Sequence, residues 1–235
     1  MLLLLTVISI ALSSVYASDG CYKIGDAVQP SYNLSVPMAF IKYKIVKDYL
    51  PVPPQDLLEA GYSSVNIQLG TKFSPPRTFN PTGREQTYVR YPKAVQGQRY
   101  ALILLDIDAP SPSNPKRAYI QGLFLNCPFD DFLGGNIVVP YVASQPTPGS
   151  GYHRYVSLVY RQSGNINPNT TSLFMLAKNR ERFSVVNFAK EYNLTGPMAG
   201  NFFLAQYTMC ESRQENLFSN RINLRDVINR IRSIL

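Results

Sequence analysis

The sequence is poor in charge and contains only one long apolar run. Of its 235 residues, 16% are charged and 45% are apolar, which is too few charges and too many apolar residues for a disordered chain. A single apolar run also excludes a protein that crosses a membrane several times. At roughly 150 residues per domain, the length suits one large domain or two small ones with a substantial core. We expect a soluble, basic, globular protein.

Patterns that bind metals or nucleic acids are missing as well. The chain has one His and three Cys, and it has no Cys-x-x-Cys, which argues against a structural zinc site. Its net charge of +8 favours anionic partners such as phosphate, acidic lipid or nucleic acid. The basic residues are scattered, without a Lys/Arg cluster or a motif of stacking aromatics. We therefore expect no nucleic-acid partner, no metal and no cofactor.

The apolar run lies at the N-terminus and reads MLLLLTVISIAL over residues 1–12. It is shorter than the roughly 20 residues that a spanning helix needs, and Val15 and Ala17 form a small-residue cleavage pattern behind it. This pattern is typical of a secretory signal peptide over residues 1–17, although its first residues include no Lys or Arg. The alternative is a buried N-terminal strand or helix. Asn33, Asn169 and Asn193 are candidate glycosylation sites, in agreement with an extracellular location.

The cysteine count is odd. Cys21, Cys127 and Cys210 remain after the signal peptide, and in an oxidising compartment three cysteines predict one disulfide and one free thiol. Three pairings satisfy this expectation, and the sequence does not choose among them.

Short apolar runs separated by proline and glycine dominate the rest of the chain. They are rich in β-branched and aromatic residues, four to eight residues long, and typical of the antiparallel sheets of a sandwich or barrel. The loop 143–152 contains two prolines and two glycines and is not expected to be regular. The predicted strands are Ser64–Leu69, Thr87–Tyr91, Tyr100–Ile107, Ile120–Leu125, Ile137–Val142 and Arg154–Tyr160.

Helices are predicted near the ends of the chain. Residues 43–50 precede a proline, and residues 182–192 have apolar side chains at helical spacing before Gly196 and Pro197. Residues 223–235 form an amphipathic pattern that Asn223 can cap, which predicts either a helix packed on the domain or a basic helix on a membrane surface. With no internal repeat or linker, we expect one domain over residues 18–210, preceded by the signal peptide and followed by an extension over residues 211–235.

Two segments carry side chains of the kinds that take part in binding or catalysis. Asp106 and Asp108 end the most apolar run of the mature chain, just before Pro110. His153 and Tyr155 share one face of a later strand, and Arg154 points to the other. A single His is more often a solvated or core residue than a site residue. Arg154 is at least as well explained by an ion pair with Asp106 or Asp108 as by a ligand.

These segments resemble the signatures of the phosphatidylethanolamine-binding protein family. YALILLDIDAPSPSNPKRAY, residues 100–119, is similar to the first signature, and GYHRYVSLVYRQ, residues 151–162, is similar to the second. RFSVVNFAKEYNLTGPMAGNFFLAQY, residues 182–207, resembles the closing helix, turn and last strand, and IVKDYLPVPPQDLL, residues 45–58, resembles the region before the first strands. The resemblance spans nearly all of residues 40–210.

The resemblance implies a mainly β fold, a sandwich of two antiparallel sheets with short helices chiefly at the C-terminal end. It also implies a small pocket at the sheet rim that accepts phosphate, acetate or a phosphoethanolamine head group. The loop 144–149 would contribute backbone N–H groups to this pocket, and Asp106 would orient His153 or take the ligand's ammonium group. The ligand-binding residues implied by position are Asp106, Pro110, Gln121, Pro146, His153 and Tyr155.

The chain departs from the family pattern at three places. Ile107 replaces the usual Pro between the two acids, and the loop reads Gln-Pro-Thr-Pro-Gly over residues 145–149. Gln121 stands where the family usually has a second His. Glutamine can donate a hydrogen bond to an anion but cannot become cationic, so we expect weaker or less pH-dependent anion binding.

The sequence therefore predicts a secreted, non-catalytic protein that binds phosphorylated head groups or other small anions, with peripheral membrane contact left open. The alternative is a secreted interaction protein, such as a serine protease inhibitor or a signalling modulator, that acts through exposed loops. An enzyme would need a nucleophile, but there is no Gly-x-Ser-x-Gly, and Ser150 lies on a loop predicted to be flexible. A head-group binder should lose its ligand on His153→Ala or Tyr155→Phe.

Overall fold

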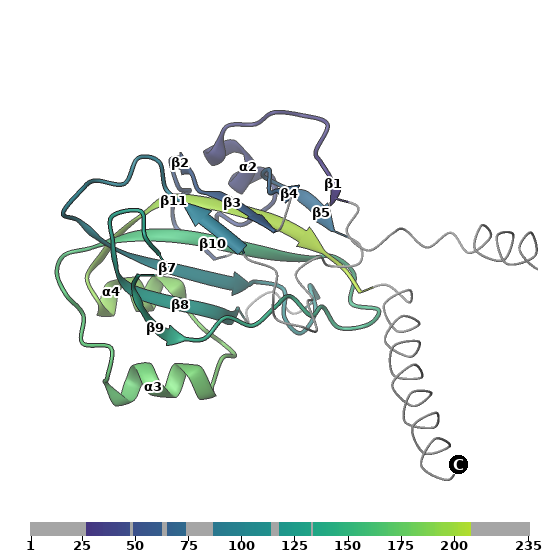
Figure 1. Ribbon diagram of the computed structural model, residues 1–235. Coiled ribbons are helices and arrows are strands. Elements are labelled where there is room, and N and C mark those ends of the chain that lie inside the picture. The colour runs from purple at the N-terminus through teal and green to yellow at the C-terminus, as the bar shows by residue number, and fades with distance from the viewer. Residues whose placement is uncertain are drawn as a thin grey trace, which may run out of the picture. The chain divides into compact units, whose positions relative to one another are not determined.

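The computed structural model describes residues 27–47, 49–62, 65–73, 87–113, 118–132 and 134–207 (Figure 1). The predicted signal peptide, the predicted C-terminal helix and the extension over residues 211–235 lie outside these ranges. Cys21 and Cys210 also lie outside them. No helix within the described ranges is long and apolar enough to cross a membrane.

The strands form a large sheet and a small one, as the sequence predicts for a mainly β sandwich. The large, eight-stranded sheet has the order β1-β5-β11-β10-β7-β8-β9, with β2 also paired to β11. Its strands are β1 Ala27–Val28, β2 Asp56–Leu57, β5 Thr71–Phe73, β7 Arg99–Asp106, β8 Tyr119–Pro128, β9 Asn136–Val139, β10 His153–Gln162 and β11 Leu194–Ala205. The small sheet has the order β4-β3-β6, with β3 Glu59–Tyr62, β4 Val65–Asn66 and β6 Thr87–Arg90.

The large sheet is mixed, whereas two purely antiparallel sheets were expected. The strand β11 pairs antiparallel with β10 on one side, but on its other side it pairs in parallel with β2 and then with β5. Its twelve residues are long enough to hold these two short strands one after the other. The remaining pairs that involve β7, β8, β9 and β10 are antiparallel.

The large sheet is buried on both faces, which explains why its central strands read as continuous apolar runs. One face packs against helices, with Ile103 and Leu158 in the same core cluster as Phe40, Leu173 and Phe188. The opposite face carries Leu102 and Val159, which pack in a separate apolar cluster. The helices are α2 Val36–Lys42, α3 Thr171–Lys178 and α4 Val185–Glu191, with α3 beside β9 in Figure 1.

The helix predicted over residues 43–50 is wrong, because the chain is helical just before that segment. The helix α2 ends at Lys42, and Lys44 and Lys47 have φ angles of 57° and 83°, which an α-helix cannot contain. By contrast, α4 confirms the helix predicted within residues 182–192, and the Ser184 side chain caps it.

The helix α3 was not predicted from the sequence. Its side chains do not form a clear apolar stripe, because Phe174 is 58% exposed and only Leu173 is buried. The Thr170 side chain caps this helix by accepting a hydrogen bond from the Leu173 N–H.

Cys127 is a free, buried thiol within the core of the large sheet. Burial raises the pKa of this thiol to about 12.

Candidate functional site

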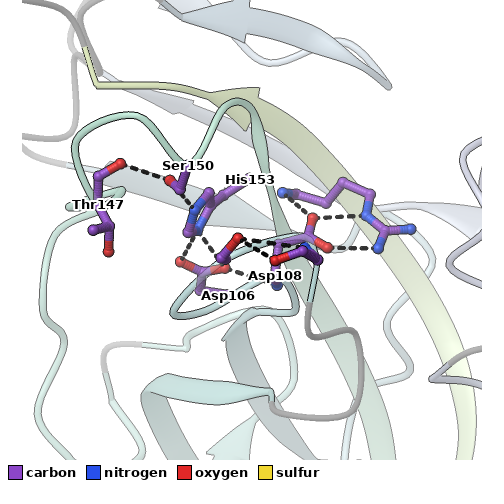
Figure 2. Close-up of polar contacts among 8 residues, drawn as sticks. Asp106, Asp108, Thr147, Ser150 and His153 are labelled. Atoms are coloured by element: carbon purple, nitrogen blue, oxygen red, sulfur yellow. Dashed lines mark hydrogen bonds and ion pairs between the residues drawn. The ribbon is translucent and has the colours of Figure 1, made fainter.

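Asp106 and His153 are brought together by the pairing of β7 with β10. Asp106 is the last residue of β7 and His153 is the first of β10, and Asp106 lies opposite Tyr155 in the register. The His153 Nδ1 atom is 2.9 Å from Asp106 Oδ2, and both side chains are buried (Figure 2). This contact agrees with the first of the two roles predicted for Asp106, that of orienting His153.

Arg154 points to the opposite face and pairs with the second acid. Its guanidinium donates through Nε and Nη2 to the two carboxylate oxygens of Asp108, at 2.8 and 2.6 Å. The backbone N–H of Arg154 also donates to Asp108, and the N–H of Asp108 donates to Asp106. The structural explanation of Arg154 is therefore confirmed. This ion pair holds the turn that presents Asp106 and Pro110.

The Ser150 hydroxyl is hydrogen-bonded to both Thr147 and His153, so it belongs to the same network as Asp106 (Figure 2). Its Oγ atom is 2.6 Å from the Thr147 carbonyl oxygen, which can only accept, so the Ser150 hydroxyl donates its single proton there. The His153 Nε2 atom, 2.7 Å from the Ser150 oxygen, must then donate to it. The His153 ring therefore bridges Ser150 through Nε2 and the Asp106 carboxylate through Nδ1.

Tyr155 stacks between His153 and Phe203, at centroid distances of 6.2 and 5.1 Å. It is almost fully buried, and its hydroxyl has no hydrogen-bond partner within the described part of the chain. Burial raises the pKa of the Tyr155 hydroxyl far above its usual value, and the nearby negative charge of Asp106 raises it further. Tyr155 is therefore a neutral group.

A cavity of about 480 Å³ opens beside Asp106, between the end of β7, the start of β8 and the loop that precedes β10. It is large enough for a small organic ligand. Its lining residues are Asp106, Ala109, Pro110, Tyr119, Gln121, Val142, Ala143, Gln145, Thr147 and Glu181.

The predicted site residues divide into two groups. Asp106, Pro110 and Gln121 line the cavity. His153 and Tyr155 do not line it, because both are about 1% exposed and lie within the core network behind Asp106. Pro146 does not line it either, although its neighbours in the loop, Gln145 and Thr147, do. Ligand binding by any of these residues stays a prediction.

Gln121 is the most informative of these residues. It is only 5% exposed, and its side-chain amide forms no hydrogen bond to any residue within the described ranges. Gln121 also lines the cavity, and ligand binding by its amide stays a prediction.

Sequence reasoning missed Tyr119 and Glu181. Tyr119 adjoins the predicted strand 120–125 and lies two residues before Gln121. The two-residue alternation of strand side chains could therefore have placed both on the same face. Glu181 lies 60 residues beyond Gln121, in the turn between α3 and α4. No local sequence signal connects this turn with β8.

The electrostatics of the cavity differ from those expected of a simple anion site. Among the residues that the structure describes, its lining includes two carboxylates, Asp106 and Glu181, and no Lys, Arg or His. The donors within it are neutral, namely the Gln121 amide and the hydroxyls of Thr147 and Tyr119. Across the described ranges, no group of three His, Cys, Asp or Glu is arranged to hold a metal ion.

Comparisons with known proteins agree with this architecture. Residues 51–203 match the model of the phosphatidylethanolamine-binding protein family. The 26 kDa secreted antigen of Toxocara canis is 36% identical over 116 residues, which are 48% of this chain and 44% of that protein. The match therefore spans less than half of that relative's length.

Solved structures share the fold at low identity. One is carboxypeptidase Y inhibitor complexed with its cognate proteinase, with a TM-score of 0.59 and 22% identity over 74% of this chain and 95% of that one. Another is the phosphatidylethanolamine-binding protein of Plasmodium vivax, with a TM-score of 0.52 and 14% identity over 74% and 98% of the two chains. At these identities the likeness is one of fold.

Proposed function

The chain belongs to the phosphatidylethanolamine-binding protein family, and from this premise we propose that it is a secreted, non-catalytic protein that binds phosphorylated head groups in the cavity beside Asp106. Gln121 supports this proposal most directly, because it lines the cavity and its side-chain amide forms no hydrogen bond to any residue that the structure describes. A phosphate oxygen would accept from this amide and from the hydroxyl of Thr147. The apolar side chains of Pro110 and Val142 would enclose the rest of the ligand.

His153 and Tyr155 enter this proposal as positioning residues. His153 fixes the Asp106 carboxylate at the cavity, and through Ser150 it ties down the loop that supplies Thr147. The Ser150 proton is already donated to Thr147, so Ser150 is not placed as a nucleophile with His153 as its base. This arrangement supports a binding role over a catalytic one.

The protein-partner alternative stays a prediction of the sequence. The solved carboxypeptidase Y inhibitor shares the fold of this chain at 22% identity, and that likeness carries no statement about a target here. Secretion rests on the predicted signal peptide and on a relative that is described as a secreted antigen.

Calorimetric titration with phosphoethanolamine tests the proposal on the chain without residues 1–17. The wild type should bind with a saturable heat. Gln121→Leu should weaken binding by about tenfold or more, because it removes a hydrogen bond to a charged group. The same variant should keep the thermal unfolding temperature, since it removes no hydrogen bond within the described part of the chain and Gln121 is only 5% exposed.

Gln162→Leu provides a matched control. Gln162 is also buried, but its amide accepts from the Asn126 N–H and donates to the Asn126 side chain and the Gly164 carbonyl. Its replacement should lower the unfolding temperature and leave the affinity of the folded protein unchanged. The proposal would be wrong if the wild type gave no heat, or if Gln121→Leu bound as tightly as the wild type.

A further inference from the structure

Cys127 is enclosed by the core of the large sheet. Its side chain is fully buried, and its thiol donates to the Phe132 carbonyl at 3.7 Å. The backbone that leads into β9 packs closely on the sulfur, since a Cβ atom added to Gly135 would lie 2.5 Å from it. Burial also raises the pKa of the thiol to about 12, which keeps it protonated. A second sulfur could reach Cys127 only if the sheet opened.

The strand register places Cys127 at one end of the large sheet. Cys127, near the end of β8, lies opposite Tyr100 of β7. The same row continues through Arg161 of β10 to Thr195, the second residue of β11. Ala205, the last residue of β11, lies ten residues beyond Thr195. At about 3.3 Å per residue, the end of β11 is therefore about 33 Å along the sheet from the row of Cys127.

The chain enters β1 at the end of the sheet where it leaves β11. Ala27, the first residue of β1, lies opposite Phe73, and Phe73 lies opposite Ala205. The strand β1 is antiparallel to β5, and β5 is parallel to β11, so β1 and β11 run in opposite directions. Because neighbouring strands are about 4.8 Å apart, the Cα atoms of Ala27 and Ala205 are separated by about 10 Å.

Chain length then decides which cysteines can meet. Cys21 precedes Ala27 by six residues, and Cys210 follows Ala205 by five. At no more than about 3.6 Å per residue, these segments span at most about 22 and 18 Å. With about 6 Å between the Cα atoms of a disulfide, neither segment covers the roughly 33 Å to the row of Cys127, even before the distance across the strands is added. Both segments are long enough to bridge the gap of about 10 Å between the two strand ends.

We infer that Cys21 and Cys210 form an intramolecular disulfide, which links the segment before β1 to the segment after β11, and that Cys127 stays reduced. This selects one of the three pairings that the sequence allows. In an oxidising compartment a bond forms between the two sulfurs. The two thiol protons and two electrons pass to a disulfide oxidant such as oxidised glutathione, which leaves as two thiols. The inference does not depend on any ligand of the cavity.

The cross-link has a physical role at the edge of the sheet. The strand β1 has two residues and pairs with β5, which has three, so its ladder contributes little stability of its own. A covalent link to the chain beyond β11 would hold β1 in place. The closed loop contains nearly the whole domain, and a disulfide restricts the unfolded chain more strongly as its loop becomes longer.

Peptide mapping tests the pairing. The chain without residues 1–17 is folded in a buffer of reduced and oxidised glutathione, alkylated with N-ethylmaleimide in denaturant, and digested without reduction. Mass spectrometry should find the peptides of Cys21 and Cys210 joined to each other and Cys127 alkylated. The inference would be overturned by a link to Cys127, by a link between two copies of the chain, or by alkylation of all three cysteines.

Cysteine variants give a second readout in the native protein. The native wild type should take up no N-ethylmaleimide, because Cys127 is buried. Cys210→Ser should take up one equivalent, at Cys21. Cys127→Ala is the matched control and should keep the Cys21 to Cys210 link. Uptake at Cys21 in the native wild type, or loss of the link in Cys127→Ala, would contradict the pairing.

Reduction tests the stabilising role. Dithiothreitol should lower the unfolding temperature of the wild type by about 5 °C or more, since it releases a long closed loop. The double variant Cys21→Ser/Cys210→Ser should unfold at the same temperature with and without dithiothreitol. Equal responses of the two proteins to the reductant would overturn the stabilising role of the disulfide.

Discussion

Asp106 and Asp108 have different tasks because β7 ends at Asp106, so that Asp108 lies beyond the strand, and because their partners His153 and Arg154 are adjacent in β10 and point to opposite faces. Asp106 faces His153 and the cavity, whereas Asp108 faces Arg154. Each carboxylate accepts more than one hydrogen bond, and the Asp108 N–H links the two by donating to Asp106. A change at Arg154 would therefore reach the cavity through Asp108 and the turn that holds Asp106.

Arg154→Ala should lower the free energy of unfolding by about 3–5 kcal/mol, because it leaves the buried Asp108 carboxylate without its cation. Urea unfolding followed by circular dichroism measures this loss. Arg90→Ala is the matched variant, since Arg90 pairs with Asp130 but its side chain is 63% exposed, against 15% for Arg154. That change should cost about 1 kcal/mol or less. Equal losses in the two variants would contradict a structural role for the Asp108 pair.

At the scale of elements, β11 connects most of the fold. It pairs with β10 along nearly its full length and holds β2 and β5 on its other edge. From the middle of β11, the Asn201 amide donates to the carbonyls of Leu58, next to β2, and Ile67, next to β4. This buried side chain therefore ties β11 to the segments that lead into and out of the small sheet.

Asn201→Ala should destabilise the protein by about 2–4 kcal/mol, because it leaves two buried carbonyl groups without donors. The measurement is the urea midpoint together with its slope, with Thr195→Ala as an exposed control on the same strand, which should stay within about 0.5 kcal/mol of the wild type. A loss at Asn201 no larger than that at Thr195 would show that the small sheet is held by apolar packing alone.

At the scale of the whole molecule, the three candidate glycosylation sites are all accessible. Asn33, Asn169 and Asn193 are exposed and lie on separate parts of the chain, before α2, before α3 and before β11. Each therefore presents its side chain to a modifying enzyme in the folded protein. Exposure at three separated positions agrees with the predicted passage through a secretory pathway.

Expression of the full chain in cultured insect cells should deliver protein to the medium with an N-terminus at Ser18. Its mass should fall after enzymatic removal of N-linked glycans, and the triple change of Asn33, Asn169 and Asn193 to Gln should abolish this shift. Mass spectrometry of the secreted protein provides both readouts. Retention of the chain inside the cell with residues 1–17 intact would contradict the predicted secretion.

The sequence by itself predicted the strands β7, β8, β9 and β10 of the large sheet, the irregular loop before β10 and the helix α4. These features follow from local properties: side-chain alternation, the fixed φ of proline and a capping Ser184. The two family signatures also singled out Asp106 and His153, whose side chains meet only because β7 pairs with β10. The helix over residues 43–50 was misplaced because the left-handed backbone at Lys44 is set by packing and not by composition.

Only the tertiary structure decided what surrounds the cavity. The pairing of the turn at residues 180–183 with the start of β8 brings Glu181 beside Gln121, and no local pattern encodes a meeting across 60 residues. The hydrogen-bond partners of the Ser150 hydroxyl, which are Thr147 and His153, were likewise known only from the tertiary structure. Local sequence fixes which elements form, because their periodicity spans a few residues. The charge and hydrogen-bonding capacity of a site depend on which elements pack together, because its groups come from distant parts of the chain.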